Sequence, residues 1–256
     1  MAIGVALLGP IIGQMILSPV ISTVIEGSGW RTAWVVLAVV AFVCGLPAGL
    51  SAGDTAKTPA FWILMVGGAV LGLGFYAFNA HVVPYATDIG ISTTAAALVL
   101  TVSSVGGAAG TLLAGAITAR LGYRWTLLVL TALNGVAVFL FVGAGSVWAF
   151  YSLAVILGFA FSAVVPVRMG VVPTLFGLRA IGTIIGFTSL SFSLGAIAGP
   201  FVAGYIFDST ASYDLAFVIF GILLMIGAAT LYFLRAPRVD PAPDPTAIWR
   251  AGDGLE

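Results

Sequence analysis

The sequence predicts an all-α membrane protein with eight transmembrane helices, and three observations support this fold class. Apolar residues make up 61% of the 256 residues and charged residues only 7%, whereas about a quarter of the residues in soluble domains are charged. The apolar residues form long continuous runs, each long enough for the roughly 20-residue helix that crosses a bilayer. A membrane β-barrel would instead show strands of about ten residues with alternating polarity. The lipid bilayer is therefore the expected environment.

Eight apolar segments account for the predicted helices, in the order 2–24, 30–50, 60–85, 93–118, 124–143, 147–173, 181–206 and 213–234. Each segment contains enough apolar residues to cross the hydrocarbon core once. An even number of crossings places both ends of the chain on the same side. Residues 236–256 are rich in proline and charge, a composition that cannot form a core, so this tail is expected to be disordered.

Basic residues lie almost entirely on alternate connections between the predicted helices. These residues are Lys57, Arg120, Arg124, Arg179, Arg235, Arg238 and Arg250, whereas Arg31 is the one basic residue on the opposite connections. Short loops that are rich in lysine and arginine stay on the cytoplasmic side of a membrane. The sequence therefore predicts a multi-pass protein of the cell membrane, plasma or inner, with both termini in the cytoplasm.

The titratable residues exclude several other classes of protein. Nine basic and nine acidic residues give a net charge of zero, which indicates neither a nucleic-acid partner nor a polybasic membrane anchor. One histidine and one cysteine offer too few ligands for a zinc cluster, and the sequence has neither a phosphate-binding loop nor a nucleophile elbow. No spacing favours a serine–histidine intramembrane protease. We therefore expect neither enzymatic activity nor a cofactor or a metal.

Two segments that each join a pair of helices are similar to each other. Residues 18–34 read SPVISTVIEGSGWRTAW, and residues 199–217 read GPFVAGYIFDSTASYDLAF. The matched positions are Pro19 with Pro200, Trp30 with Tyr213 and Ala33 with Ala216. The first two helices therefore correspond to the last two. If the chain is built from two six-helix repeats, the last six helices form one complete copy, and four helices are missing before the first.

Four pairs of glycines are spaced four residues apart on the predicted helices. The pairs are Gly68 with Gly72, Gly106 with Gly110, Gly182 with Gly186, and Gly195 with Gly199. Glycine lets two helix backbones approach closely where lipid provides no hydrophobic drive for association. The pairs therefore predict tight helix packing. Sliding along these faces during transport is the second interpretation.

The segment GAITARLGYR, residues 115–124, resembles the loop signature G-x-L-A-D-R-x-G-R-R of the major facilitator superfamily. Gly115, Arg120, Gly122 and Arg124 occupy the signature positions, and Ala119 stands where the signature has aspartate. Parallel six-helix repeats are the architecture of this superfamily. The resemblance implies a secondary transporter.

The residues His81, Pro84, Asp88, Gly90 and Ser92 have the spacing H-x-x-P-x-x-x-D-x-G-x-S. This spacing resembles that of the monocarboxylate-porter and oxalate/formate-antiporter branch of the superfamily. The resemblance implies the last two helices of an N-terminal bundle, a cytoplasmic linker, a complete C-terminal six-helix bundle and a cytoplasmic tail. The corresponding ranges are 1–50, 51–59, 60–235 and 236–256.

The only histidine of the chain lies on a predicted helix face that carries several functional side chains. Gly74, Phe78, His81, Tyr85 and Asp88 recur at intervals of three and four residues, so they line one side of the helix. The spacing predicts a gate near the outer end of a central cavity, with His81 and Tyr85 as its candidates. The alternative is a histidine that only bonds a neighbouring helix or is solvated at the interface.

Arg168 is the only strong charge inside an apolar segment, and an unpaired charge at membrane depth is costly. Its candidate partners are an anionic substrate, an acid on helices absent from this chain, or the cytoplasmic interface, which the side chain could reach by extending along the helix. A guanidinium can hold a carboxylate with two parallel hydrogen bonds. The resemblance therefore implies that Arg168 attracts a small organic anion.

Polar residues and prolines on other predicted helices complete the candidate list. Gln14, Ser18 and Ser22 are spaced by four residues, so they line a wet cavity or, as is more common for a single polar residue, bond a neighbouring helix. Pro84, Pro166 and Pro200 are expected to kink their helices, because proline leaves one carbonyl of the helix without a donor.

The sequence as a whole predicts secondary active transport of a small organic anion, similar to a monocarboxylate, by alternating access. His81 is the one embedded group in the chain that titrates near neutrality, so a proton is the candidate coupled ion. Two alternatives stay open. The chain could be a membrane subunit that needs the missing N-terminal helices, in cis or in trans, or it could be a porter for a different small solute.

Overall fold

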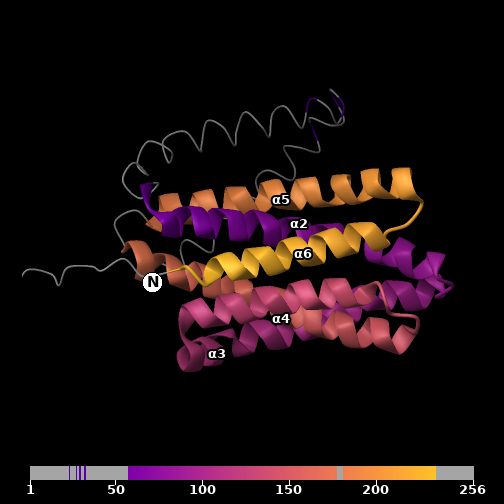
Figure 1. The fold of residues 1–256 in the computed structure, drawn as a ribbon, viewed down its shortest axis with the longest axis horizontal. Coiled ribbons are helices and arrows are strands. Elements are labelled where there is room, and N and C mark those ends of the chain that lie inside the picture. Colours follow the sequence, from indigo (N-terminus) through magenta and orange to yellow (C-terminus); the bar gives the residue numbers. More distant parts are fainter. Residues whose placement is uncertain are drawn as a thin grey trace, which may run out of the picture.

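The computed structural model describes residues 57–177 and 181–234, together with Thr23, Gly27, Gly29 and Thr32. The helices of this part are α2 (Pro59–Asp88), α3 (Thr93–Phe141), α4 (Val147–Phe176), α5 (Ile181–Thr210) and α6 (Asp214–Leu231). Each is long and apolar enough to cross a membrane, and Figure 1 shows them side by side. The first two predicted segments and the predicted tail lie almost wholly outside the described residues, so the total of eight helices is not confirmed.

Helix α3 folds back on itself, so its 49 residues form two arms. Both of its ends lie beside the start of α4: the Tyr151 hydroxyl donates to the carbonyl of Ala95 at 3.1 Å, and the rings of Phe141 and Phe150 are 5.2 Å apart. The reversal occurs at Gly122, whose φ of 76° and ψ of 159° are not helical. Glycine adopts a positive φ without a steric penalty. The two segments predicted on either side of Gly122 are therefore the first and second arms of α3.

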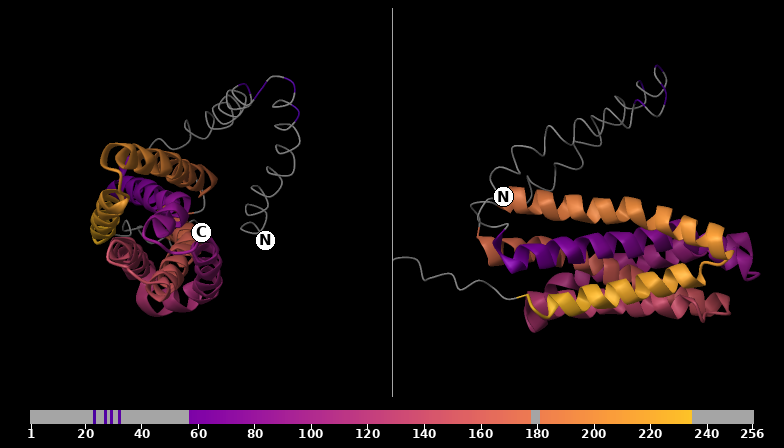
Figure 2. Two further views of the ribbon diagram at one scale, coloured as in Figure 1. Left: turned by 90° about the vertical axis from the view of Figure 1, so that its right-hand side faces the viewer. Right: turned by 45° about the horizontal axis from the view of Figure 1, so that its top comes forward.

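The helices form two close pairs, with α6 beside both. Helix α2 packs along α5, the first arm of α3 packs along α4, and α6 contacts α2 and α3, whereas α4 and α5 touch only sparsely. The end-on view of Figure 2 shows this arrangement. One end of the bundle contains the turn at Gly122 and the last residues of α6, and we call it the Gly122 end. The other contains the last residue of α2, and we call it the Asp88 end.

Glycines hold each close pair together. At six positions a side-chain Cβ would overlap the backbone of the partner helix: Gly72, Gly195 and Gly199 between α2 and α5, and Gly106, Gly110 and Gly158 between α3 and α4. The predicted tight packing is confirmed at these positions, and sliding along the same faces stays a prediction. For Gly182 and Gly186 close packing stays a prediction, because a Cβ there would meet nothing within 4 Å among the described residues.

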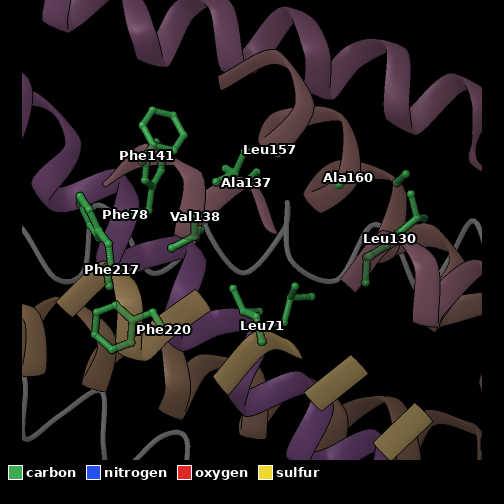
Figure 3. Close-up of a cluster of buried hydrophobic side chains, with 14 of the residues drawn as sticks. Leu71, Phe78, Leu130, Ala137, Val138, Phe141, Leu157, Ala160, Phe217 and Phe220 are labelled. Carbon is green, nitrogen blue, oxygen red and sulfur yellow. The ribbon is translucent and has the colours of Figure 1, made fainter. Parts of the chain in front are cut away.

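Aromatic side chains fill the middle of the bundle toward the Asp88 end. Phe78, Phe141, Phe217 and Phe220 are each no more than 1% exposed. The Phe78 ring lies 4.6 Å from the Phe141 ring and 6.0 Å from the Phe217 ring, and Figure 3 shows this cluster. The cluster fixes α2 against α3 and α6. It therefore positions the polar residues that follow Phe78 on α2.

The three prolines expected to kink helices all lie inside helices, namely Pro84 in α2, Pro166 in α4 and Pro200 in α5. Pro166 has no N–H for the carbonyl of Ser162, four residues before it. The Thr111 hydroxyl of α3 lies 3.5 Å from that carbonyl, but it lies closer, at 3.1 Å, to the carbonyl of Gly107 on its own helix. The kinks themselves stay a prediction.

Candidate functional site

Arg168 crosses from α4 to the backbone of α2. Its Nη2 donates to the carbonyl of Leu64 at 3.1 Å. The guanidinium lies where a side chain of Gly68 would be, because a Cβ built on Gly68 would overlap Nη2 and lie 2.9 Å from Cζ and from Nη1. The glycine therefore makes the space that the guanidinium occupies. The glycine spacing predicted a helix backbone against Gly68, but the side chain of Arg168 lies against it instead.

No carboxylate lies near Arg168 in the described part of the chain. The acidic residues of ranges 57–177 and 181–234 are Asp88, Asp208 and Asp214. All three lie at or near the Asp88 end, because they close α2, precede the end of α5 and open α6. Arg168 donates its hydrogen bond to Leu64, close to the first residue of α2, and this part of α2 lies toward the Gly122 end. Among the described residues, the positive charge is thus held by a carbonyl and has no ion-pair partner.

The surroundings of Arg168 are almost entirely apolar. A void of about 10 Å³ beside it is lined by Leu64, Gly67, Leu71, Leu127, Thr131, Val164, Arg168 and Leu231. This space is about that of a single water, and only Thr131 offers a second polar side chain to it. The guanidinium therefore lies among α2, α3, α4 and α6, and its one hydrogen bond to a described residue is that to the Leu64 carbonyl.

Four aromatic rings connect α2, α4 and α5 farther along the same interface, and we call them the aromatic bridge. The rings of Phe75 and Phe161 stack in parallel at 3.3 Å, Phe192 lies 6.1 Å from Phe161, and Tyr76 lies 5.9 Å from Phe192. Phe161 precedes Arg168 by two helical turns, so both face α2. The sequence analysis missed the bridge. The seven-residue spacing that Gly68–Phe75 shares with Phe161–Arg168 is the signal that could have suggested it.

His81 connects α2 to α5 and α6. Its Nε2 lies 3.0 Å from the carbonyl of Pro200, and because a carbonyl only accepts, this nitrogen carries the proton. The His81 ring lies 4.9 Å from the ring of Tyr213, which itself stacks on Phe207 at 4.3 Å. The contact with a neighbouring helix that the sequence analysis gave as the alternative is present. It does not exclude a gate, because such a bond could open.

Tyr85 connects α2 to α6 and to the second arm of α3. Its hydroxyl donates to Oδ1 of Asp214 at 2.9 Å and lies 3.4 Å from the carbonyls of Phe141 and Val142. The side chain is 5% exposed. One turn of α2 thus bears two tethers that reach three other helices. His81 and Tyr85 on this face of α2 thus make contacts between helices, and the predicted gate stays a prediction.

A cavity of about 290 Å³ opens at the Asp88 end beside these tethers. Its lining includes Tyr85, Asp88, Tyr213 and Asp214, together with residues of the loops that follow α3 and α5. Burial raises the pKa of the Tyr213 hydroxyl, and the negative charges of Asp88 and Asp208 raise it further. Tyr213 therefore stays neutral near pH 7. The cavity is acidic, so it does not suit an anionic substrate.

The loop signature forms the turn of α3. Gly122 is the reversal itself, and a Cβ on Gly115 would meet no described residue within 4 Å. Arg120 is exposed, whereas the Cζ of Arg124 lies 4.6 Å from the centre of the Tyr232 ring.

Two other candidates, Gln14 and Ser18, lie outside the described residues. Within the described ranges, no group of three or more histidine, cysteine or acidic side chains could hold a metal.

The length and hydropathy of these helices, with their glycine-mediated pairs, define a multi-pass α-helical membrane protein. The sequence profile of the Major Facilitator Superfamily matches residues 64–251. Since this match covers more than half of the chain, the chain belongs to that superfamily.

Several relatives carry the name of monocarboxylate transporters. The chain is 28% identical to monocarboxylate transporter 11 of Homo sapiens over 277 residues, which cover 96% of this chain and 58% of the relative. It is 30% identical to monocarboxylate transporter 13 of Rattus norvegicus over 172 residues, which cover 64% of this chain and 39% of the relative. It is also 36% identical to the probable sulfoacetate transporter SauU of Cupriavidus necator over 66 residues, 26% of this chain and 15% of the relative. The chain thus spans less than two thirds of these relatives, and the resemblance to monocarboxylate transporters is confirmed.

Proposed function

We propose that this chain takes part in secondary transport of a small organic anion, similar to a monocarboxylate, by alternating access. The observation that carries the proposal is Arg168. It is an embedded cation that uses one hydrogen bond to a carbonyl and has no carboxylate partner among the described residues. An arginine in that state needs an anion, because an unpaired charge at membrane depth is costly. The names of the relatives favour a carboxylate as that anion.

The guanidinium suits a carboxylate by its geometry. It has five N–H donors in one plane and can donate two parallel hydrogen bonds to the two carboxylate oxygens. In the described part only Nη2 of Arg168 donates to another group, the carbonyl of Leu64. That bond fixes one edge of the plane and leaves donors on the other edges for a ligand. The aromatic bridge, which faces α2 two helical turns before Arg168, offers an apolar surface for the rest of such an anion.

The tethers of His81 and Tyr85 support a gate at the Asp88 end. For this end to open, α2 must separate from α5 and α6, so the bonds to the Pro200 carbonyl and to Asp214 must break. Protonation of a second ring nitrogen of His81 would change the charge at this point. A proton is therefore the proposed coupled ion. The basic loops support cytoplasmic termini in a plasma or inner membrane, with the gate on the outer side.

Uptake by proteoliposomes tests the role of Arg168. We expect Arg168→Gln to lower uptake of radiolabelled lactate or pyruvate by at least tenfold, since a hydrogen-bonded charge contributes about 1.5–3 kcal/mol. Arg250→Gln is the matched control, because it removes the same charge from the tail. Equal uptake by the two variants, with equal amounts of protein in the membrane, would contradict the proposal.

A second candidate function is that of a membrane subunit that transports only together with further helices. It is favoured by the coverage, since the chain spans 58% of one relative and 39% of another. Uptake by the chain alone and uptake after coexpression with the first four helices of a related transporter distinguish the two. Activity only on coexpression would support the subunit. Activity of the chain alone would support independent transport.

A further inference from the structure

Arg124 lies between two aromatic rings at the Gly122 end of the bundle. Its Cζ is 4.6 Å from the centre of the Tyr232 ring and 5.4 Å from the centre of the Trp125 ring. Arg124 follows the turn of α3, and Tyr232 follows the last residue of α6. The side chain thus bridges two helix ends. A guanidinium above an aromatic face is attracted by the ring and is held in a defined orientation.

Among the described residues, the hydrogen-bond donors of Arg124 have no protein acceptor. Its Nε is the one buried side-chain nitrogen or oxygen of the described ranges that has no hydrogen-bond partner. No hydrogen bond or ion pair of the two terminal nitrogens occurs among those residues either. The Trp125 and Tyr232 rings meet at 68° beside the guanidinium, and neither ring offers an acceptor in the plane of its N–H groups, so an oxyanion could bind the terminal nitrogens.

The charge distribution favours an anion at this end. Every acidic residue of the ranges 57–177 and 181–234 lies at or near the opposite end, close to Asp88. Arg120 lies before the reversal at Gly122, on the other arm of α3, and is exposed at the same end of the bundle. A bound oxyanion at Arg124 therefore meets no described carboxylate that would repel it.

The neighbouring aromatic side chains indicate the depth of this site in the bilayer. Trp125 is 48% exposed and Tyr232 is 51% exposed. Exposed tryptophan and tyrosine at the ends of membrane helices lie at the level of the lipid headgroups. The anion that is present at this depth in large excess is the phosphate of a phospholipid. Basic residues near helix ends bind such headgroups when the lipid carries a net negative charge.

We propose that Arg124 binds the phosphate group of an anionic membrane phospholipid, with Tyr232 and Trp125 holding the guanidinium in place. The terminal nitrogens donate two hydrogen bonds to phosphate oxygens, while the acyl chains follow the outer surface of α6 and the second arm of α3. The bound lipid would thereby join the turn of α3 to the end of α6. This site lies apart from Arg168 and does not depend on the proposed transport.

The test is titration of the purified full-length chain, in neutral detergent, with phosphatidylglycerol, phosphatidylcholine or inorganic phosphate, with native mass spectrometry to count bound lipids. We expect phosphatidylglycerol to bind more tightly than phosphatidylcholine, and Arg124→Gln to weaken its binding by about tenfold, the effect of losing a charge-assisted hydrogen bond. Arg120→Gln is the matched control and should change it less than twofold.

Tyr232→Ala and Tyr232→Phe test the ring without altering any charge. We expect the alanine variant to weaken phosphatidylglycerol binding by about threefold, because the cation–π contact is lost, and the phenylalanine variant to bind as the unmodified protein does. If Arg124→Gln does not fold, the comparison of Tyr232→Ala with Tyr232→Phe still tests whether the guanidinium held by this ring binds the lipid. Equal loss in the Arg120 and Arg124 variants would overturn the proposal in favour of general surface charge. Equal binding of phosphatidylcholine, or displacement of the lipid by millimolar inorganic phosphate, would also overturn it.

Discussion

Replacement of Gly68 by alanine should displace the guanidinium of Arg168 without touching its charge. A Cβ at this position would overlap Nη2 and lie 2.9 Å from both Cζ and Nη1, distances at which the neighbouring group must move. The bond from Nη2 to the Leu64 carbonyl, 3.1 Å long, is then lost, and with it the position of the guanidinium relative to the anion. A hydrogen bond from a charged donor contributes about 1.5–3 kcal/mol. If the displaced guanidinium loses one such bond to the anion, the variant binds the anion about tenfold more weakly.

The adjacent Gly67 provides a matched control on the same helix. A Cβ there would lie 3.9 Å from Cδ2 of Leu231, an ordinary contact. We expect Gly68→Ala to raise the KM for lactate uptake by about tenfold and Gly67→Ala to leave it within about twofold, since only the first loses the charged hydrogen bond. Both variants should be made in the form of the protein that transports. A KM that is the same in both variants, at equal melting temperature, would refute the role given to Arg168.

Three further predictions concern the contacts between helices. Gly106→Ala and Gly195→Ala should each lower the melting temperature of the purified protein, because the added Cβ would overlap the backbone of the partner helix. Gly186→Ala is the control and should not lower it. Equal shifts in all three variants would contradict the close contacts at Gly106 and Gly195. Tyr85→Phe removes the hydrogen bond to Asp214 and should destabilise the closed Asp88 end by about 1 kcal/mol, measurable as faster labelling of a cysteine placed at Ala211; unchanged labelling would argue against a tether. His81→Gln keeps a donor for the Pro200 carbonyl but does not titrate, so it should abolish stimulation of uptake by a proton gradient and preserve stability. Retained stimulation would assign the coupling to another group.

The sequence predicted those parts of the fold that depend on local pattern. The turn of α3 follows from Gly122, whose positive φ only glycine adopts easily. The glycine spacing predicted close pairs correctly at Gly106 and Gly195, but at Gly68 the Arg168 side chain, and not a helix backbone, fills the space. Spacing shows only that a helix face is smooth, and whether another helix lies against that face is decided by the whole bundle.

The candidate site was predictable residue by residue, but its partners were not. An embedded Arg168 and a lone His81 are conspicuous in so apolar a chain. Their acceptors are the carbonyls of Leu64 and Pro200, and a backbone carbonyl leaves no signature in a sequence. The aromatic bridge was missed for a related reason, since phenylalanine is common in membrane helices. Only the arrangement of three helices brings Phe75 and Phe161 together.

Protection of Arg168 from chemical modification tests the central claim most directly. Phenylglyoxal modifies accessible arginines, and mass spectrometry of peptides reports the rate at each residue of the purified chain. We expect a saturating monocarboxylate to slow modification of Arg168 and to leave that of the exposed Arg120 unchanged. Equal rates at Arg168 with and without the monocarboxylate would contradict the account, because the anion would then bind elsewhere.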